Sequence, residues 1–185
     1  KWDMAKIDIR TKELIEKICT IYPYPDVSVT QRIDDSIVDE MTALDMCVEV
    51  AISERPITCI RKRRTFKTED NKKGYTVVPF KMYPQGDKEK YWFGYRDKRF
   101  EDIEDCDEQY MILGCRNKTL SVVRFPREFI EQNLGMLNTS VNSETGEISH
   151  YHIVIFKNPD GKMTMLLSKP ALREIDISDY VVGEI

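Results

Sequence analysis

Hydrophobic and polar positions follow two different periods along the chain. In 1–55, apolar side chains recur at three- and four-residue spacing, which predicts helices over about 11–22 and 36–51. The end of the second run, 47–52, is equally compatible with a strand. From about residue 56 the period changes to two, which is typical of strands. We therefore expect an N-terminal helical segment, 1–55, packed on a β-rich core formed by 56–185.

The β-rich part is divided by turns into short elements. Alternating or compact apolar runs predict strands over 57–60, 75–83, 88–97, 110–115, 120–125, 150–156 and 162–167. Pro126 is expected to open a helix that ends at Gly135. The charged stretch 97–107 is typical of a short helix or loop on the surface, and the polar stretch 138–147 of a loop. The last residues, 171–185, predict a short amphipathic segment.

These elements predict the fold class. Consecutive strands are joined by turns rather than by helices, which excludes a doubly wound parallel sheet. The first three strands are expected to form an antiparallel meander, and Pro79 indicates an edge strand or a bulge in the second of them. We predict an α+β fold with a curved antiparallel sheet or a partly open β-barrel, with the N-terminal helices and one inserted helix packed outside.

The stretch 88–97 is unusually rich in aromatic rings, with four rings in five residues. Alternate side chains of a strand face opposite sides, so three rings are expected on one face: Tyr91, Phe93 and Tyr95. Trp92 and Arg96 would share the other face, with Gly94 leaving a gap where a flat ligand or another backbone approaches. The strand is either an ordinary core strand throughout, or one side of it forms the wall of a pocket for a planar group such as a base.

Charge is distributed unevenly along the chain. The net charge is −4, yet 57–100 contains thirteen Lys or Arg against five Asp or Glu. A basic surface of this kind attracts polyanions, because Lys and Arg neutralise phosphates and release counterions. The residues expected to bind a DNA backbone are Arg61, Lys62, Arg63, Arg64, Lys67, Lys72 and Lys73. The alternative is a solvated charged strand and turn with no ligand.

The sequence contains no recognisable catalytic set. His150 and His152, the only histidines, would share one face of a strand, but a catalytic zinc site normally takes three protein ligands. Glycine-rich phosphate loops and serine-nucleophile motifs are absent. The five cysteines lack the spacing of metal ligands or redox pairs, and no apolar run reaches the ~20 residues of a membrane span. We expect a non-catalytic domain with no cofactor, no metal and no membrane partner.

The order of the elements in 57–168 is similar to that of a known family. The segments that carry the similarity are Tyr91-Trp92-Phe93-Gly94-Tyr95, Tyr110-Met111-Ile112-Leu113-Gly114-Cys115, Phe125-Pro126 and His150-Tyr151-His152-Ile153-Val154-Ile155. In strand order and in the pattern of hydrophobic residues, the chain resembles the SRA-like C-terminal DNA-recognition domain of type IV restriction enzymes. These enzymes act on DNA that contains modified cytosine. The B3-type DNA-binding domains of restriction proteins are similar too, less closely.

The resemblance implies an SRA/PUA-like barrel, or a B3-like one for the second family, that grips double-stranded DNA. An SRA-like domain extrudes 5-methylcytosine or a related base into an aromatic pocket. The residues expected to line this pocket are Tyr75, Tyr91, Trp92, Tyr95, Arg96 and Asp97. Either Asp97 or Glu89 would accept a hydrogen bond from the cytosine amino group, and this choice stays open. The resemblance also implies nuclease and helicase modules elsewhere in a larger parent chain, working in phage defence in the bacterial cytoplasm.

Three other functions are compatible with the same residues. A B3-type domain would read unmodified sequence in the major groove without flipping a base. A protein-interaction module would use the aromatic strand as core and the basic run as a rim for an acidic partner. An enzyme with an unfamiliar site would use His150 and His152.

Overall fold

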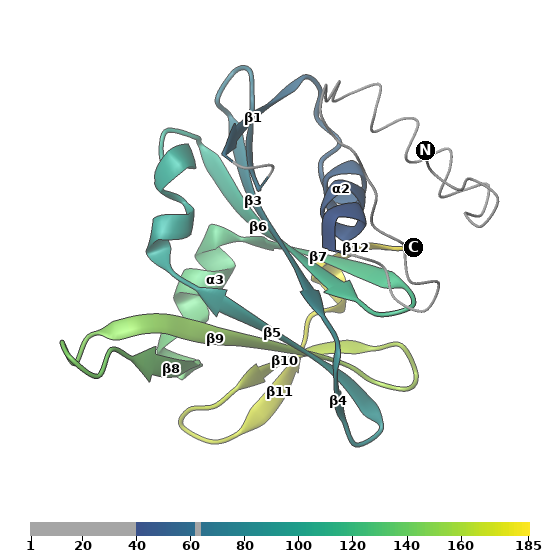
Figure 1. Ribbon diagram of the computed structural model, residues 1–185, viewed down its shortest axis with the longest axis vertical. Coiled ribbons are helices and arrows are strands. Elements are labelled where there is room, and N and C mark those ends of the chain that lie inside the picture. Colours follow the sequence, from purple (N-terminus) through teal and green to yellow (C-terminus); the bar gives the residue numbers. More distant parts are fainter. Residues whose placement is uncertain (1–39, 62–63) are drawn as a thin grey trace.

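Two open β-sheets make up most of the protein, and the computed structural model describes residues 40–61 and 64–185 (Figure 1). The first sheet has the strand order β1 (Ile57–Arg61), β2 (Thr65–Thr68), β3 (Lys73–Lys81), β6 (Glu108–Arg116), β7 (Leu120–Pro126) and β12 (Val181–Glu184). The second has the order β11 (Arg173–Asp176), β10 (Met163–Leu167), β9 (Ile148–Lys157), β5 (Lys88–Tyr95) and β4 (Tyr83–Gln85), with β8 (Asn138–Val141) also paired to β9.

Two short α-helices accompany the sheets within the described residues. Helix α2 (Glu40–Ala51) packs on the first sheet against β3, β6, β7 and β12, and α3 (Arg127–Asn133) follows β7 (Figure 1). Four 3₁₀ turns complete the described chain: η2 (Asp97–Arg99), η3 (Glu101–Ile103), η4 (Leu134–Met136) and η5 (Ser178–Tyr180). The predicted α+β class with an open β-structure is therefore confirmed, but the strands form two sheets rather than one antiparallel sheet or barrel.

The first sheet is covered on both faces, which divides the core in two. One cluster lies between α2 and the sheet, and Tyr75 and Val77 of β3 belong to it. The other lies between the two sheets and includes Val78 from the opposite face of β3. Side chains of a strand alternate between its faces, so β3 contributes to both clusters. Burial of these apolar side chains is the main force that holds the layers together.

The aromatic strand β5 supplies the second cluster with its largest side chains. Tyr91, Phe93 and Tyr95 are buried between the sheets, while Trp92 on the opposite face is only partly buried. The predicted alternation along this strand is therefore confirmed.

The predicted meander of the first three strands is wrong. Strand β3 pairs antiparallel with β2 but parallel with β6, from Lys73 opposite Glu108 to Lys81 opposite Arg116. The chain then leaves the first sheet, and β4 and β5 form a hairpin in the second one, where β5 pairs with β9. This arrangement buries one face of β5 against the first sheet, which a flat meander would not do. The pairing of β2 with β3 ends before Pro79, so one side of β3 is a free edge at this proline. A proline is expected at such an edge because it has no backbone N–H to donate.

Several boundaries differ from the prediction. The stretch 138–147 contains β8, and 171–185 forms β11 and β12 rather than an amphipathic segment. These edge strands are four residues long and largely exposed or half-buried, so they lack the alternation that identifies a strand. Residues 47–51 are helical, which excludes the alternative strand. The predicted helix over 11–22 lies outside the described residues.

Candidate functional site

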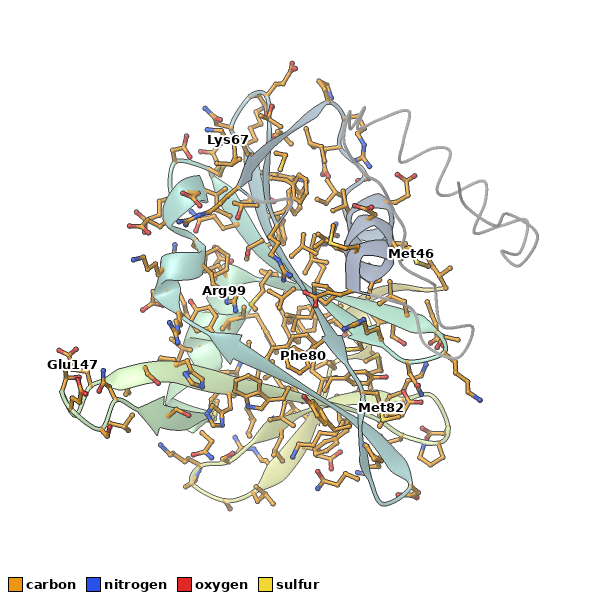
Figure 2. The ribbon with its side chains drawn as sticks, in the orientation of Figure 1. Met46, Lys67, Phe80, Met82, Arg99 and Glu147 are labelled. Carbon is orange, nitrogen blue, oxygen red and sulfur yellow. The ribbon has the colours of Figure 1, made fainter. Side chains whose placement is uncertain are left out.

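An open cleft of about 500 Å³ lies between the two sheets. Strands β3 and β5 come together near β4 and separate toward η2 and η3, which connect β5 to β6 (Figure 1). Phe80 and Arg99 lie in this region (Figure 2). The lining residues come from seven elements and two connecting positions: Arg61, Arg64, Thr65, Thr76, Val78, Phe80, Trp92, Gly94, Arg96, Lys98, Arg99, Asp102 and His150. The cleft joins parts of the basic run to one face of the aromatic strand.

Trp92 is the centre of the aromatic part of the cleft. Its ring meets Phe80 edge to face at 6.0 Å between centroids, and His150 and His152 in the same way at 5.5 and 5.3 Å. The two histidines stack on each other at 5.2 Å, so they share one face of β9 as predicted. Edge-to-face contacts of this kind hold an aromatic ring in a fixed orientation. Trp92 is therefore a pre-positioned, partly exposed ring at the cleft wall.

Each histidine has one ring nitrogen bonded to a serine. His152 Nε2 lies 2.8 Å from Ser140 Oγ, and His150 Nδ1 lies 2.9 Å from Ser149 Oγ. Burial, and then the neighbouring His150, lower the pKa of His152. Among the described residues no cluster of three or more metal-ligating side chains exists.

The gap predicted at Gly94 is filled by the protein itself. A Cβ added there would lie 3.2 Å from Trp92 Cη2 and 3.5 Å from the Cδ2 atom of His150. The indole of Trp92 therefore lies along its own strand and covers Gly94. Glycine permits this close approach because it has no Cβ. Gly94 still contributes to the lining of the cleft next to Trp92.

Basic side chains dominate the other part of the cleft. Five cations line it, Arg61, Arg64, Arg96, Lys98 and Arg99, against one carboxylate, that of Asp102. Arg61 pairs with Asp102 at 3.2 Å, and Arg64 pairs with Glu40 of α2. Within 40–61 and 64–185, Arg96, Lys98 and Arg99 form no ion pair with an acid, because every remaining salt bridge joins other residues. The cleft therefore has excess positive charge.

Arg99 is the most deeply placed of these cations. Its Nε donates to the backbone carbonyl of Gly94 at 3.0 Å, which ties η2 to the aromatic strand. Burial, and then the positive charges of Arg64 and Arg96, lower the pKa of Arg99. Arg64 and Arg96 thus both lie close enough to Arg99 to repel it.

Most of the basic residues predicted to bind a DNA backbone are already engaged. Lys67 pairs with Asp105 at 3.0 Å, Lys72 with Asp70 at 3.6 Å, and Lys73 with Glu54 at 2.6 Å. None of these three lysines lines the cleft. Lys62 and Arg63 lie outside the described residues. The run contributes Arg61 and Arg64 to the cleft, and its three described lysines lie outside the cleft.

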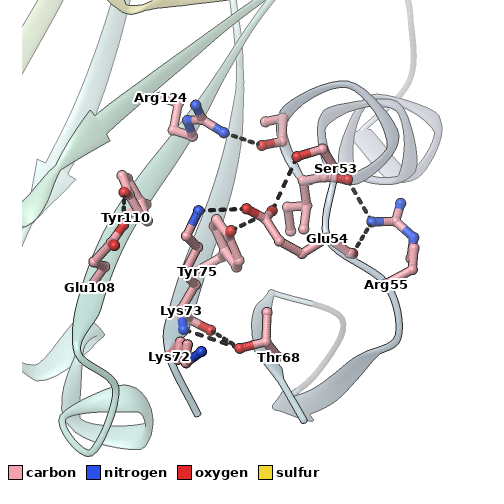
Figure 3. A network of polar contacts seen from close by, with 12 residues as sticks. Ser53, Glu54, Arg55, Thr68, Lys72, Lys73, Tyr75, Glu108, Tyr110 and Arg124 are labelled. Atoms are coloured by element: carbon pink, nitrogen blue, oxygen red, sulfur yellow. Dashed lines mark hydrogen bonds and ion pairs between the residues drawn. The ribbon is translucent and has the colours of Figure 1, made fainter. Parts of the chain in front are cut away.

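Lys73 and Tyr75 belong to a separate network beneath α2 (Figure 3). Glu54 Oε1 accepts from Lys73, and its Oε2 accepts from the Tyr75 hydroxyl at 2.8 Å. Burial by itself would raise the pKa of Glu54, but the hydrogen bonds from Lys73 and Tyr75 outweigh it and lower the pKa to about 2. This network joins the end of α2 to β3 and is structural.

Four of the predicted pocket residues are placed elsewhere. Tyr75, Tyr91 and Tyr95 are core side chains with at most 1% of their surface exposed, so they do not reach the cleft. Their burial follows from the strand alternation, which points them away from Trp92. Asp97 accepts from the Tyr95 hydroxyl at 3.0 Å and is not a lining residue. Trp92 and Arg96 do line the cleft.

The two acids considered for the cytosine amino group are both engaged outside the cleft. Glu89 accepts from the Tyr91 hydroxyl and from Asn117 Nδ2, and Asp97 from Tyr95. The carboxylate that does line the cleft is Asp102, which sequence reasoning missed. It lies among several acids in 101–107, and no local pattern distinguishes it from the others. Arg99 was missed in the same way, because its burial depends on the second sheet.

Comparison with known protein families, curated proteins and solved structures gave no match to this chain. Neither helix within the described residues has the length and apolar character that crossing a bilayer requires. The functional argument therefore rests on the geometry and chemistry of the cleft.

Proposed function

We propose that this protein is a non-catalytic DNA-recognition domain that takes one base of a duplex, a modified cytosine, into the cleft between its two sheets. The observation that carries the proposal is the placement of a fixed, partly exposed Trp92 beside a cluster of cations in one cleft. Rings that stack bases next to side chains that neutralise phosphates are a recurring combination in nucleic-acid recognition.

The size of the cleft and one of its polar groups both suit the binding of a single cytosine base. Its volume of about 500 Å³ lies within the range of small-molecule sites, roughly 300–1,000 Å³. Asp102 supports the choice of cytosine: its Oδ2 pairs with Arg61, and its Oδ1, which has no partner among the described residues, would accept a hydrogen bond from the cytosine amino group. Extruding a base costs a few kcal/mol, which stacking on Trp92 and hydrogen bonding to Asp102 would recover.

The rim of the cleft supports contact with the duplex around the extruded base. Arg96 and Lys98 are exposed and follow directly after the aromatic strand. They would hold phosphates on either side of the base. In this proposal an SRA-like domain reads the DNA, while nuclease and helicase modules are carried by other parts of a larger protein.

The test compares a duplex containing one central 5-methylcytosine with the same unmodified duplex by fluorescence anisotropy at two salt concentrations. A 2-aminopurine beside the target base reports flipping by an increase in its fluorescence. We expect tighter binding of the methylated duplex and a fluorescence increase. Trp92→Ala should remove both, with a loss of roughly 1–3 kcal/mol for the stacked base.

Tyr83→Ala is the matched control, because Tyr83 is also an exposed ring, 52% accessible, and lies outside the cleft. Equal loss of affinity in both variants would exclude a base pocket at Trp92. Methylation-independent binding with no 2-aminopurine signal would favour a B3-type reader. Absence of DNA binding at low salt would overturn the proposal and favour a protein-interaction module.

A further inference from the structure

The two ends of the cleft differ in chemistry along a single strand. Thr76, Val78 and Phe80 are alternate residues of β3, and all three line the cleft. Phe80 contacts Trp92 at the aromatic end. Thr76 lies four residues away, which is roughly 13 Å along a strand. The cleft thus changes from aromatic to polar over this distance.

A pair of threonines marks the polar end. Thr65 of β2 lies opposite Thr76 of β3, and the two side chains are 5% and 3% exposed. Both line the cleft, and neither hydroxyl has a hydrogen-bond partner in the part of the chain that the structure describes. Neither oxygen is among the fully buried unpaired atoms of the described residues, so the little surface that remains exposed includes the hydroxyls. Both hydroxyls are therefore available to donate hydrogen bonds to a ligand in the cleft.

The charges around this end favour an anion. Arg99 and Arg96 have no acid partner within 40–61 and 64–185, and Arg99 lies near both Arg64 and Arg96. Glu40 pairs with Arg64, and Asp102 pairs with Arg61, so two carboxylates oppose the five cations of the cleft. An anion bound among the arginines would relieve their repulsion and accept hydrogen bonds from both threonines.

We infer that the polar end of the cleft is a phosphate subsite, so that the cleft holds a nucleotide together with its own phosphate rather than a base alone. This inference rests on the proposed function and specifies its ligand. The base lies against Trp92 and Phe80, and Arg99 with Thr65 and Thr76 binds the phosphate. A phosphate suits this position because it offers several acceptor oxygens to the guanidinium and hydroxyl donors.

Free mononucleotides test the subsite without duplex DNA. The chain has two tryptophans, so a Trp2→Phe background leaves Trp92 as the single tryptophan reporter. We would titrate 5-methyldeoxycytidine and its 5′-monophosphate, and repeat the second titration in the presence of inorganic phosphate. Isothermal calorimetry on the native chain checks the affinities. We expect the monophosphate to bind at least about tenfold tighter than the nucleoside, and inorganic phosphate to compete with it.

The double variant Thr65→Val with Thr76→Val removes both hydroxyls and keeps the side-chain shape. In this variant the monophosphate should lose most of its affinity advantage over the nucleoside, and the affinity for the nucleoside should stay unchanged. Arg96→Gln should likewise reduce the affinity advantage of the monophosphate. Lys118→Gln is the matched charge control, because Lys118 is exposed in the turn after β6 and lies outside the cleft. Circular dichroism confirms that each variant is folded.

The outcomes separate this inference from the proposed function. Equal binding of nucleoside and monophosphate, with methylated duplex still bound through Trp92, overturns the phosphate subsite alone. Phosphate-dependent binding of the mononucleotide without duplex binding supports the subsite and overturns the proposed duplex reader. If neither the nucleotide nor the duplex binds, both proposals are overturned.

Discussion

Replacing Glu54 by Gln is expected to destabilise the fold in a strongly pH-dependent way. The carboxylate joins the end of α2 to Lys73 and Tyr75 of β3 (Figure 3). Glutamine keeps the shape and an acceptor oxygen but removes the charge. The variant therefore tests the charge of Glu54 rather than its packing.

The magnitude follows from the pKa of Glu54, which falls from its usual 4.5 to about 2 in the folded protein. Each unit of difference between folded and unfolded states corresponds to about 1.4 kcal/mol, which gives an upper bound of about 3.5 kcal/mol. The side chains of Lys73 and Glu54 are 33% and 28% exposed, so solvent screens the pair. We expect a loss of about 1–2 kcal/mol at pH 7, or a fall in melting temperature of about 2–8 °C.

The sign of the pH dependence follows from the lowered pKa. As pH falls, the unfolded chain takes up the proton before the folded one, so the stabilisation by Glu54 is complete above about pH 5 and disappears as pH approaches 2. Glutamine does not titrate in this range. The difference in stability between the two proteins should therefore fall below half of its neutral value by about pH 3.

Urea unfolding of both proteins at pH 7 and pH 3 measures this difference. Glu69→Gln is the control, because Glu69 is exposed in the turn after β2 and forms no hydrogen bond or ion pair within the described residues. The control should match the native protein at both pH values. A difference for Glu54→Gln that is as large at pH 3 as at pH 7 would refute the charged network. Lys73 would then be free to bind phosphate, as the sequence first suggested.

Two further predictions concern the parallel strand pair and the rim of the cleft. Gly114→Ala should cost about 1–3 kcal/mol, because the new Cβ would lie 2.6 Å from Cys47 Sγ and 3.2 Å from Pro79 Cα. Urea unfolding measures the loss of stability. Adding Cys47→Ala to the same chain should restore most of that stability. If it restores none, the strain does not arise from contact with Cys47. Removing the rim charges with Arg96→Gln and Lys98→Gln should make the slope of log Kobs against log salt shallower by about 0.9 for each charge. Anisotropy titrations measure the slope, and an unchanged one would show that these side chains do not contact DNA phosphates.

The sequence by itself predicted which side chains of the central strands share a face. The alternation in 91–95 places Tyr91 and its two alternate partners in the core and leaves Trp92 on the other face. The two-residue spacing of His150 and His152 likewise predicts their shared face, and the structure stacks them beside Trp92. Such predictions succeed because the orientation of a side chain on a strand depends only on the local backbone.

Only the tertiary structure decided which strands are neighbours and which charges are neutralised. The pairing of β3 with β6 and the transfer of β5 to the second sheet depend on how two apolar faces are buried together, which no single strand specifies. The acids that pair with Lys73, Lys67 and Arg61 lie 19, 38 and 41 residues away along the chain. A local count of charge therefore overestimates the free basic surface. The same folding brings Arg99 and Trp92 into one cleft, because the chain must turn from the second sheet back to the first between β5 and β6.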